Sequence, residues 1–163
     1  MMTKKEVFQG VPGMLRPFKE FLEASGFAPG DQIVYYGCPG TCTPFVELLA
    51  FAVRGLKFTQ VFVPYVDEQG ARSLTLVPEV GMQASDKIEI KKPVALVVMG
   101  GLSMPNVPVE VAQMKEVLSR YPGATTIGVC FMKMFEKAGW LSEISFDLLI
   151  DATISPVEVI KEE

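Results

Sequence analysis

Two cysteines stand close together in a short segment rich in glycine, proline and threonine, GCPGTCTP at residues 37–44. The segment follows the apolar run IVYY, which has the composition of a buried strand. Cys38 and Cys42 therefore lie in a turn at a strand end, where a thiol can act as a nucleophile or a redox group. A helix that begins after the turn would favour the thiolate and lower its pKa. Both thiols are thus candidate catalytic groups.

The third cysteine, Cys130, ends another apolar stretch, TTIGVC. If the two strands end at the same edge of a sheet, Cys130 could approach Cys38 and Cys42. Three thiolates can bind a soft metal or an iron–sulfur cluster and leave one position open. The four-ligand spacing of standard metal motifs and a CxxC redox motif are both absent. The plain alternative is that all three cysteines are small, buried hydrophobic residues, and these interpretations stay open.

The chain contains no histidine, and this restricts the chemistry more than any other feature of the composition. It excludes a Ser-His-Asp triad, a Cys-His dyad, a histidine general base and every metal site that uses histidine. Any catalysis would have to use Cys, Asp, Glu, Lys, Tyr or a cofactor, and the sequence does not identify a cofactor.

The composition also limits the partners. The chain has 163 residues, which suits one globular domain over residues 1–163. Its net charge of −4 argues against a nucleic-acid partner, because phosphate binding needs a basic face. No apolar segment has the length of a signal-peptide core at the N-terminus or of a membrane span. We therefore expect a cytoplasmic protein with reduced thiols and no membrane partner.

Apolar runs alternate with amphipathic segments along the chain. The pattern predicts an α/β fold of three layers, Rossmann-like, with a mostly parallel sheet and helices on both faces. The predicted strands are residues 32–36, 58–63, 93–99, 125–130 and 146–150, and the predicted helices are 16–25, 44–54, 108–120 and a short one within 131–140. The helix at 44–54 is apolar almost all round, which predicts deep burial, with Thr43 as its N-cap.

Residues 72–90 depart from this alternation and predict an antiparallel edge insert. SLTLV at 73–77 and KIEI at 87–90 both alternate in polarity, and PEVGMQASD between them has the composition of a turn. We therefore expect a hairpin, or edge strands exposed on one side, at one border of the sheet.

Unusual residues gather in the loops that follow the predicted strands. Ligands of open α/β sheets bind outside the carboxyl ends of the strands, so we expect a small anionic or nucleotide-like ligand there. Backbone N–H groups in the glycine-containing loops could cradle a phosphate or carboxylate. The candidate ligand-binding residues are Gly37, Gly40, Thr41, Thr43, Gly100, Gly101, Ser103, Asn106, Asp67 and Asp151.

One loop has a partial likeness to a known motif. DQIVYYGCPG is similar to the first motif of Rossmann-type methyltransferases, which implies binding of S-adenosylmethionine. The segment departs from that motif, because Pro39 stands where a glycine is expected and no acidic residue ends the second strand. The glycines could equally serve tight turns between strand and helix.

Three segments together resemble a small family of archaeal proteins, mostly from methanogens, that is known as a domain of unknown function. They are GVPGMLRPF at 10–18, GCPGTCTPF at 37–45 and VVMGGLSMPN at 97–106. The resemblance covers nearly the whole chain and implies a cytoplasmic, anaerobic setting. It brings no activity, cofactor or catalytic residue. A ligand-binding protein, a thiol or metal protein, and a non-catalytic scaffold or regulatory homodimer therefore stay open as functions.

Overall fold

The core of the protein is a seven-stranded sheet in the order β4-β3-β2-β1-β5-β6-β7. We describe it from a computed structural model, which describes residues 3–163. Strands β2, β1, β5, β6 and β7 are parallel, whereas β3 and β4 pair antiparallel at one edge. The strands are β1 Gln32–Gly37, β2 Thr59–Pro64, β3 Arg72–Val77, β4 Gly81–Lys87, β5 Pro93–Met99, β6 Thr125–Phe131 and β7 Leu148–Ala152. The predicted α/β fold with its antiparallel edge insert is confirmed.

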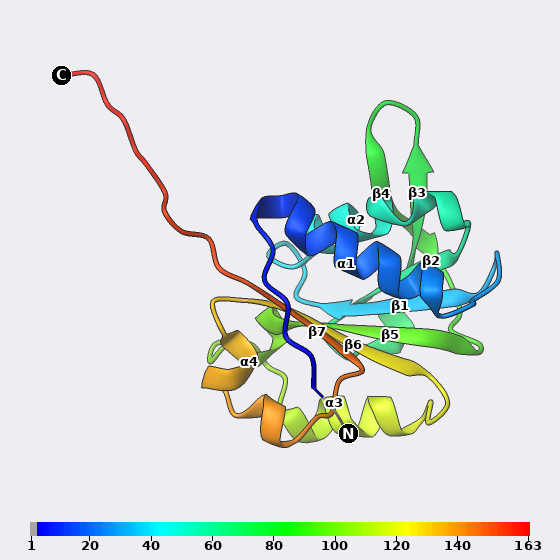
Figure 1. Ribbon diagram of the computed structural model, residues 1–163. Coiled ribbons are helices and arrows are strands. Elements are labelled where there is room, and N and C mark those ends of the chain that lie inside the picture. Colours follow the sequence, from blue (N-terminus) through cyan, green and yellow to red (C-terminus); the bar gives the residue numbers. More distant parts are fainter. Residues whose placement is uncertain (1–2) are drawn as a thin grey trace.

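Helices cover both faces of this sheet. Figure 1 shows α1 and α2 on one face, and α3 with the short α4 on the other. None of the helices within residues 3–163 is long and apolar enough to cross a membrane. The helices are α1 Gly10–Ala24, α2 Thr43–Ala52, α3 Val111–Ser119 and α4 Met134–Lys137, and the 3-10 turns are η1 Arg54–Leu56, η2 Glu68–Gly70, η3 Gly100–Ser103 and η4 Trp140–Ser142.

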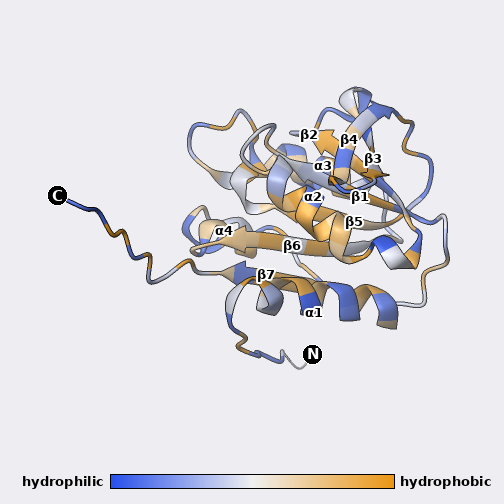
Figure 2. Ribbon diagram, turned by 90° about the horizontal axis from the view of Figure 1, so that it is seen from above, coloured by the Kyte–Doolittle hydropathy of each residue, from blue (hydrophilic) through white to orange (hydrophobic). Residues whose placement is uncertain are grey.

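The two central strands form the most buried part of the molecule. Buried side chains of β1 and β5 point to both faces of the sheet, and β5 is strongly apolar in Figure 2. Strands that helices cover on both faces read as continuous apolar runs rather than alternating ones. PVALVVM is such a run, and its predicted place as a central parallel strand is confirmed.

The first helix is longer than the sequence predicted. It begins at Gly10 rather than near Arg16, so Pro17 lies inside the helix and not in its first turn. The reason is a buried stripe of Met14, Phe18 and Leu22, whose spacing places all three on one helical face. Burial of this stripe outweighs the low helix propensity of the glycines and prolines in GVPG.

The edge hairpin has a shorter turn than predicted. Residues 78–80 form the turn and GMQASDK forms β4, whereas we expected most of GMQASD in the turn and KIEI as the strand. Leu76 pairs with Met82, which is buried, and this contact sets the register despite the polar residues that follow. After β4 the chain crosses to β5, where the backbone N–H of Lys91 donates to the side chain of Gln32 at 2.9 Å.

The observed boundaries of α3 and β7 also differ from the predicted ones. Helix α3 begins three residues later than predicted, because Glu110 caps it and forms a capping box with Gln113. Strand β7 covers Leu148–Ala152 rather than 146–150, and it is the edge strand rather than a core strand. Only Ile150 is buried within β7, as expected where one side of a strand has no neighbour.

Candidate functional site

The carboxyl ends of β1 and β5 form the topological switch point of the sheet. The chain leaves β1 toward β2 on one side, and it leaves β5 toward β6 on the other side. The parallel strands thus follow the order 2-1-3-4-5, one of the common orders of doubly wound sheets, in which ligands bind at this point. GCPGTCTP follows β1 and GGLSMPN follows β5, so the two predicted loops meet here.

Close packing of glycine against sulfur joins the two loops. A Cβ atom at Gly101 would overlap Sγ of Cys42 and would lie 3.6 Å from Sγ of Cys38. A Cβ atom at Gly37 would lie 2.8 Å from Cβ of Cys42. Contacts this short leave no room for a side chain, so glycine is required for β1, β5 and the start of α2 to approach one another.

Cys130 packs against Gly100, the residue before Gly101. A Cβ atom at Gly100 would overlap Cβ of Cys130 and lie 2.8 Å from its Cα. Within residues 3–163, however, no group of three or more cysteine, histidine or acidic side chains is arranged to hold a metal ion. The structure therefore gives no support to a metal site of Cys38, Cys42 and Cys130, and that prediction stays untested by any bound metal.

All three thiols are free and buried, with 4%, 5% and 1% of Cys38, Cys42 and Cys130 exposed. Burial, with a smaller contribution from the neighbouring Cys42, raises the pKa of Cys38 to about 11. Burial likewise raises the pKa of Cys130 to about 11, although backbone N–H groups at the start of α4 lower it. The expectation of a lowered pKa is thus wrong for Cys38, because the cost of burying a thiolate exceeds the effect of the helix N-terminus.

A hydrogen bond between two of its own residues closes the first loop, residues 37–44. Thr43 is the first residue of α2 rather than its N-cap, which is Cys42 with no capping side chain. The hydroxyl of Thr43 instead accepts the backbone N–H of Gly40 at 3.0 Å. Gly40 and Thr41 at the tip are exposed to solvent. The loop therefore has a buried base made by the thiols and a free tip of backbone and hydroxyl groups.

The second loop is also closed by a hydroxyl. Ser103 donates to the carbonyl of Gly100 at 2.7 Å, which fixes the turn of η3. Gly100 and Gly101 are buried, whereas Met104 and Asn106 are exposed. The polar surface of this loop thus lies beyond its glycines.

The two predicted carboxylates lie to either side of this meeting point. Asp67 follows β2 and accepts the N–H of Gln69 at 3.1 Å, which caps η2. Asp151 lies on β7, two strands from β5, where it accepts the N–H of Lys133 at 3.0 Å. Both carboxylates thus have a local structural role, and Asp151 is the farther from the switch point in strand order.

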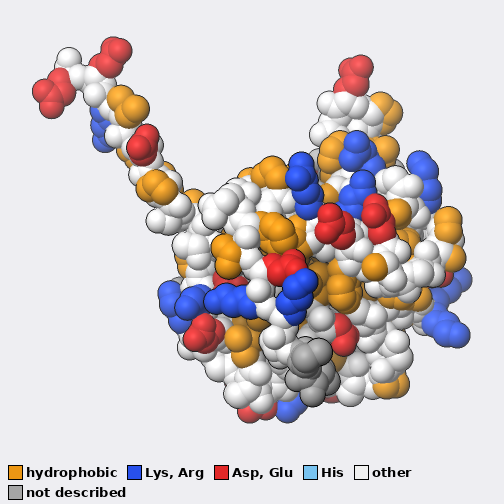
Figure 3. Space-filling view, in the orientation of Figure 1, with side chains coloured by type: hydrophobic (Ala, Val, Ile, Leu, Met, Phe, Trp, Pro, Cys, Tyr) orange, Lys and Arg blue, Asp and Glu red, His pale blue; other side chains and the backbone are white. Residues whose placement is uncertain are grey.

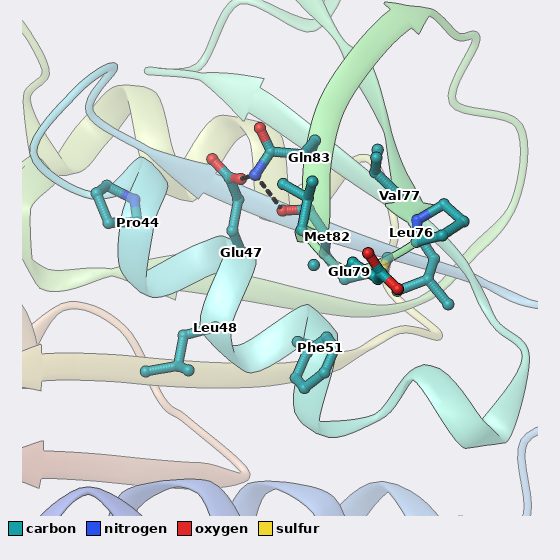
Figure 4. Close-up of a pocket in the computed structure, with 12 residues that line it drawn as sticks. Pro44, Glu47, Leu48, Phe51, Leu76, Val77, Glu79, Met82 and Gln83 are labelled. Carbon is teal, nitrogen blue, oxygen red and sulfur yellow. Dashed lines mark hydrogen bonds between the residues drawn. The ribbon is translucent and has the colours of Figure 1, made fainter.

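A groove between α2 and the β3–β4 hairpin is the feature that sequence reasoning missed. It has a volume of about 690 Å³ and is mainly apolar, and Figure 4 shows its walls. Across it, Nε2 of Gln83 donates to Oε2 of Glu47 at 2.8 Å. Burial raises the pKa of Glu47. The lining residues are Pro44, Glu47, Leu48, Phe51, Leu76, Val77, Pro78, Glu79, Val80, Gly81, Met82 and Gln83.

The one sequence feature that relates to this groove is the apolar surface on all sides of α2. We expected that surface to be buried deeply, but Phe51 is 36% exposed and Leu48 is half-buried. The buried face consists of Val46, Leu49 and Ala50. Leu48 and Phe51 line the groove beside the hairpin rather than lying buried in the core (Figure 4). The prediction of deep burial is therefore wrong for one side of the helix.

Comparisons with known proteins identify relatives over nearly the whole chain. A family model described as an uncharacterised protein conserved in archaea, DUF2124, matches residues 9–155. An uncharacterised protein of Methanocaldococcus jannaschii is 37% identical over 145 residues, 89% of this chain and 86% of the relative. An uncharacterised protein of Methanothermobacter thermautotrophicus is 34% identical over 155 residues, 94% of this chain and 95% of the relative. A crystal structure of a protein of unknown function from Methanothermobacter thermautotrophicus superposes with a TM-score of 0.86 at 31% identity, over 99% of both chains.

Proposed function

The chain belongs to the archaeal family DUF2124, and we propose that it is a cytoplasmic protein that binds a small anionic or nucleotide-like ligand at the β1–β5 switch point. One observation carries the proposal, namely that two glycine-containing loops meet at the edge where doubly wound sheets bind ligands. Backbone N–H groups of tight turns at such an edge can bind phosphate or carboxylate oxygens.

The cysteines have a structural role in this proposal. The thiols of Cys38 and Cys130 are buried and have a raised pKa, which makes them poor nucleophiles, because the thiolate is the reactive form. Their packing against Gly100 and Gly101 instead fixes the spacing of the two loops. Three unpaired thiols also suit a reducing compartment, which supports the proposed cytoplasmic location.

The ligand would contact the exposed loop tips rather than the buried base. Gly40 and Thr41 of the first loop and Asn106 of the second present backbone, hydroxyl and amide groups to solvent. None of these side chains is charged, so affinity would come from oriented dipoles and hydrogen bonds. A negative charge placed at the tip should therefore repel an anionic ligand without altering the packed base.

A thermal-shift panel of inorganic phosphate, mononucleotides and S-adenosylmethionine tests the proposal. A ligand that binds the folded chain at about 100 times its Kd should stabilise it by about 2.7 kcal/mol and raise Tm. Thr41→Glu should remove the shift that phosphate or a mononucleotide causes, because it places a carboxylate next to the anion at the tip of the loop. Ser25→Glu is the control, because it adds the same charge after α1, at the amino edge of the strands.

Two results would contradict the proposal. The first is that no member of the panel raises Tm in the wild-type chain. The second is that phosphate or a mononucleotide stabilises the Thr41→Glu and Ser25→Glu variants as much as it stabilises the wild-type chain, which would place the ligand elsewhere on the surface.

A further inference from the structure

The last eleven residues, 153–163, leave the body of the molecule as an extended arm. Figure 1 shows the arm running away from the sheet after β7, and Figure 3 shows apolar side chains along it with solvent on both sides. Ile154, Val157, Val159 and Ile160 are 58%, 69%, 74% and 90% exposed. Within the described chain, no residue after Ala152 belongs to the core or packs against it. Exposed apolar side chains in such number are typical of a segment that another surface covers.

The sequence of the arm has the pattern of a strand. Successive side chains of an extended chain point to opposite sides. Val157, Val159 and Lys161 therefore share one side, whereas Glu158 and Ile160 share the other. One side of the arm thus carries two β-branched apolar residues followed by a positive charge.

The groove between α2 and the hairpin is complementary to that side of the arm. Its walls are mainly apolar, and its charged lining residues are Glu47 and Glu79, which are both acidic. Leu76 and Val80 remain 48% and 66% exposed there. The groove could therefore cover the two valines while an acidic residue faces Lys161.

The hairpin beside the groove also has an open edge. Among the strands of residues 3–163, β4 is the last in the sheet and pairs only with β3, so none of them pairs with its outer backbone groups. An extended peptide can add to such an edge as a further strand. Residues 157–161 span about 17 Å when extended, which fits within the seven residues of β4 at about 23 Å.

We propose that two copies of the chain exchange these arms, each arm docking along β4 and in the groove of the other copy. A second copy is the favoured occupant, because one chain carries both the uncovered arm and the uncovered groove. Reciprocal exchange forms a closed dimer in which both surfaces are covered. The solved relative superposes over 99% of this chain, so the aligned region includes most of the arm.

Measurement of the mass in solution by sedimentation tests the exchange. We expect a wild-type dimer and a monomer for Val157→Glu/Val159→Glu, with the dimer Kd raised at least ~100-fold by the loss of two buried valines. Val7→Glu/Val11→Glu is the matched control, because those valines are 76% and 55% exposed and lie outside the arm. The control should remain a dimer, and all variants should keep the far-UV circular dichroism of the wild type.

A groove variant, Leu76→Glu/Val80→Glu, tests where the arm docks. It should also be a monomer alone, but it should dimerise with the arm variant, because one intact arm and one intact groove remain in that mixture. A monomeric wild type at millimolar concentration, or an arm variant that stays dimeric, would overturn the exchange. A groove variant that stays dimeric would overturn the docking site. All of these outcomes are independent of ligand binding at the switch point.

Discussion

At the scale of single residues, Gly100 and Gly101 occupy positions where any added side chain would overlap a cysteine. The two positions differ in what the added atom would meet. At Gly101 it meets Sγ of Cys42, which is the end of a side chain, whereas at Gly100 it meets Cβ and Cα of Cys130. Removal of a thiol can therefore make room at Gly101 but not at Gly100.

We predict that removal of the neighbouring thiol restores stability to an alanine variant of Gly101 but not to one of Gly100. Gly101→Ala should lower the free energy of unfolding by about 1 to 3 kcal/mol through overpacking, and Cys42→Ala should restore part of that loss. Gly100→Ala should cost more, and Cys130→Ala should restore nothing. Urea unfolding of the single and double variants measures both couplings. Equal rescue at the two sites would contradict the contacts described here.

The raised pKa values of the thiols predict a loss of stability at high pH. A cysteine has a pKa near 9.0 when unperturbed, and Cys38 and Cys130 have values of about 11 in the folded chain. Below pH 9 both states keep the proton, so the stability is fully present. Above pH 9 the unfolded chain releases protons that the folded chain keeps, and the free energy of unfolding falls as pH rises toward 11.

Urea unfolding in a reducing buffer at pH 8, 9 and 10 measures this loss. The slope should be smaller in Cys38→Ala/Cys130→Ala than in the wild-type chain. Tyr35, Tyr36 and Tyr121 also have raised pKa values and add to the slope of both chains as the pH approaches 10, so the thiol contribution is the difference between the two slopes. A slope that the double variant leaves unchanged would show that other groups cause it.

The sequence could place the three cysteines at one edge of the sheet but could not predict their burial. Their position follows from the ends of apolar runs, which are local features of the chain. Their burial depends on Gly100 and Gly101, which lie about sixty residues after Cys38 in the sequence. A pattern read along the chain contains no measure of such distant contacts, and this is why the lowered pKa expected for Cys38 was wrong.

At the scale of elements, Gln60 joins β2, β1 and α2. It is 3% exposed, and its Oε1 accepts the hydroxyl of Tyr35 on β1. Its Nε2 donates to the carbonyl of Ala50 at 3.0 Å, near the end of α2, where helix carbonyls lack partners within the helix. One amide thus satisfies two buried polar groups on two neighbouring elements.

We predict that Gln60→Leu is among the more destabilising isosteric changes in the sheet. Two buried groups would lose their partner, at about 1 to 3 kcal/mol each, so the free energy of unfolding should fall by about 2 to 6 kcal/mol. Tyr35→Phe is the control and should cost less, because Gln60 keeps its bond to Ala50. Denaturant unfolding compares the two. A Gln60→Leu variant as stable as Tyr35→Phe would show that the amide contributes little.

The sequence predicted an element correctly where both of its faces are buried, and it failed where only one side is buried. PVALVVM was identified as a central strand, because two covered faces give a continuous apolar run. The outer face of α2 was expected to be buried, because an apolar helix gives no sign of which face its neighbours leave open. The start of α1 was missed for a related reason, since contacts of Met14 outweigh the local preference of GVPG.

At the scale of the whole molecule, alternation of strand and helix was enough to predict the parallel sheet, and the departure of residues 72–90 from that alternation predicted its edge insert. The strand order was not predicted, because it depends on which side of β1 the chain returns to after the hairpin. The groove and the extended arm were not predicted either. Both depend on the direction in which the hairpin and the arm leave the sheet, and a pattern of residue types along the chain does not determine that direction.

The most direct test of the central proposal is an amide-resolved NMR titration of the full chain with inorganic phosphate, mononucleotides and S-adenosylmethionine. The proposal predicts saturable shifts of backbone amides in residues 37–43 and 100–106, the two loops that meet at the switch point. The amides of the groove should not move. Shifts confined to other surfaces, or none at millimolar ligand, would contradict a ligand site between β1 and β5.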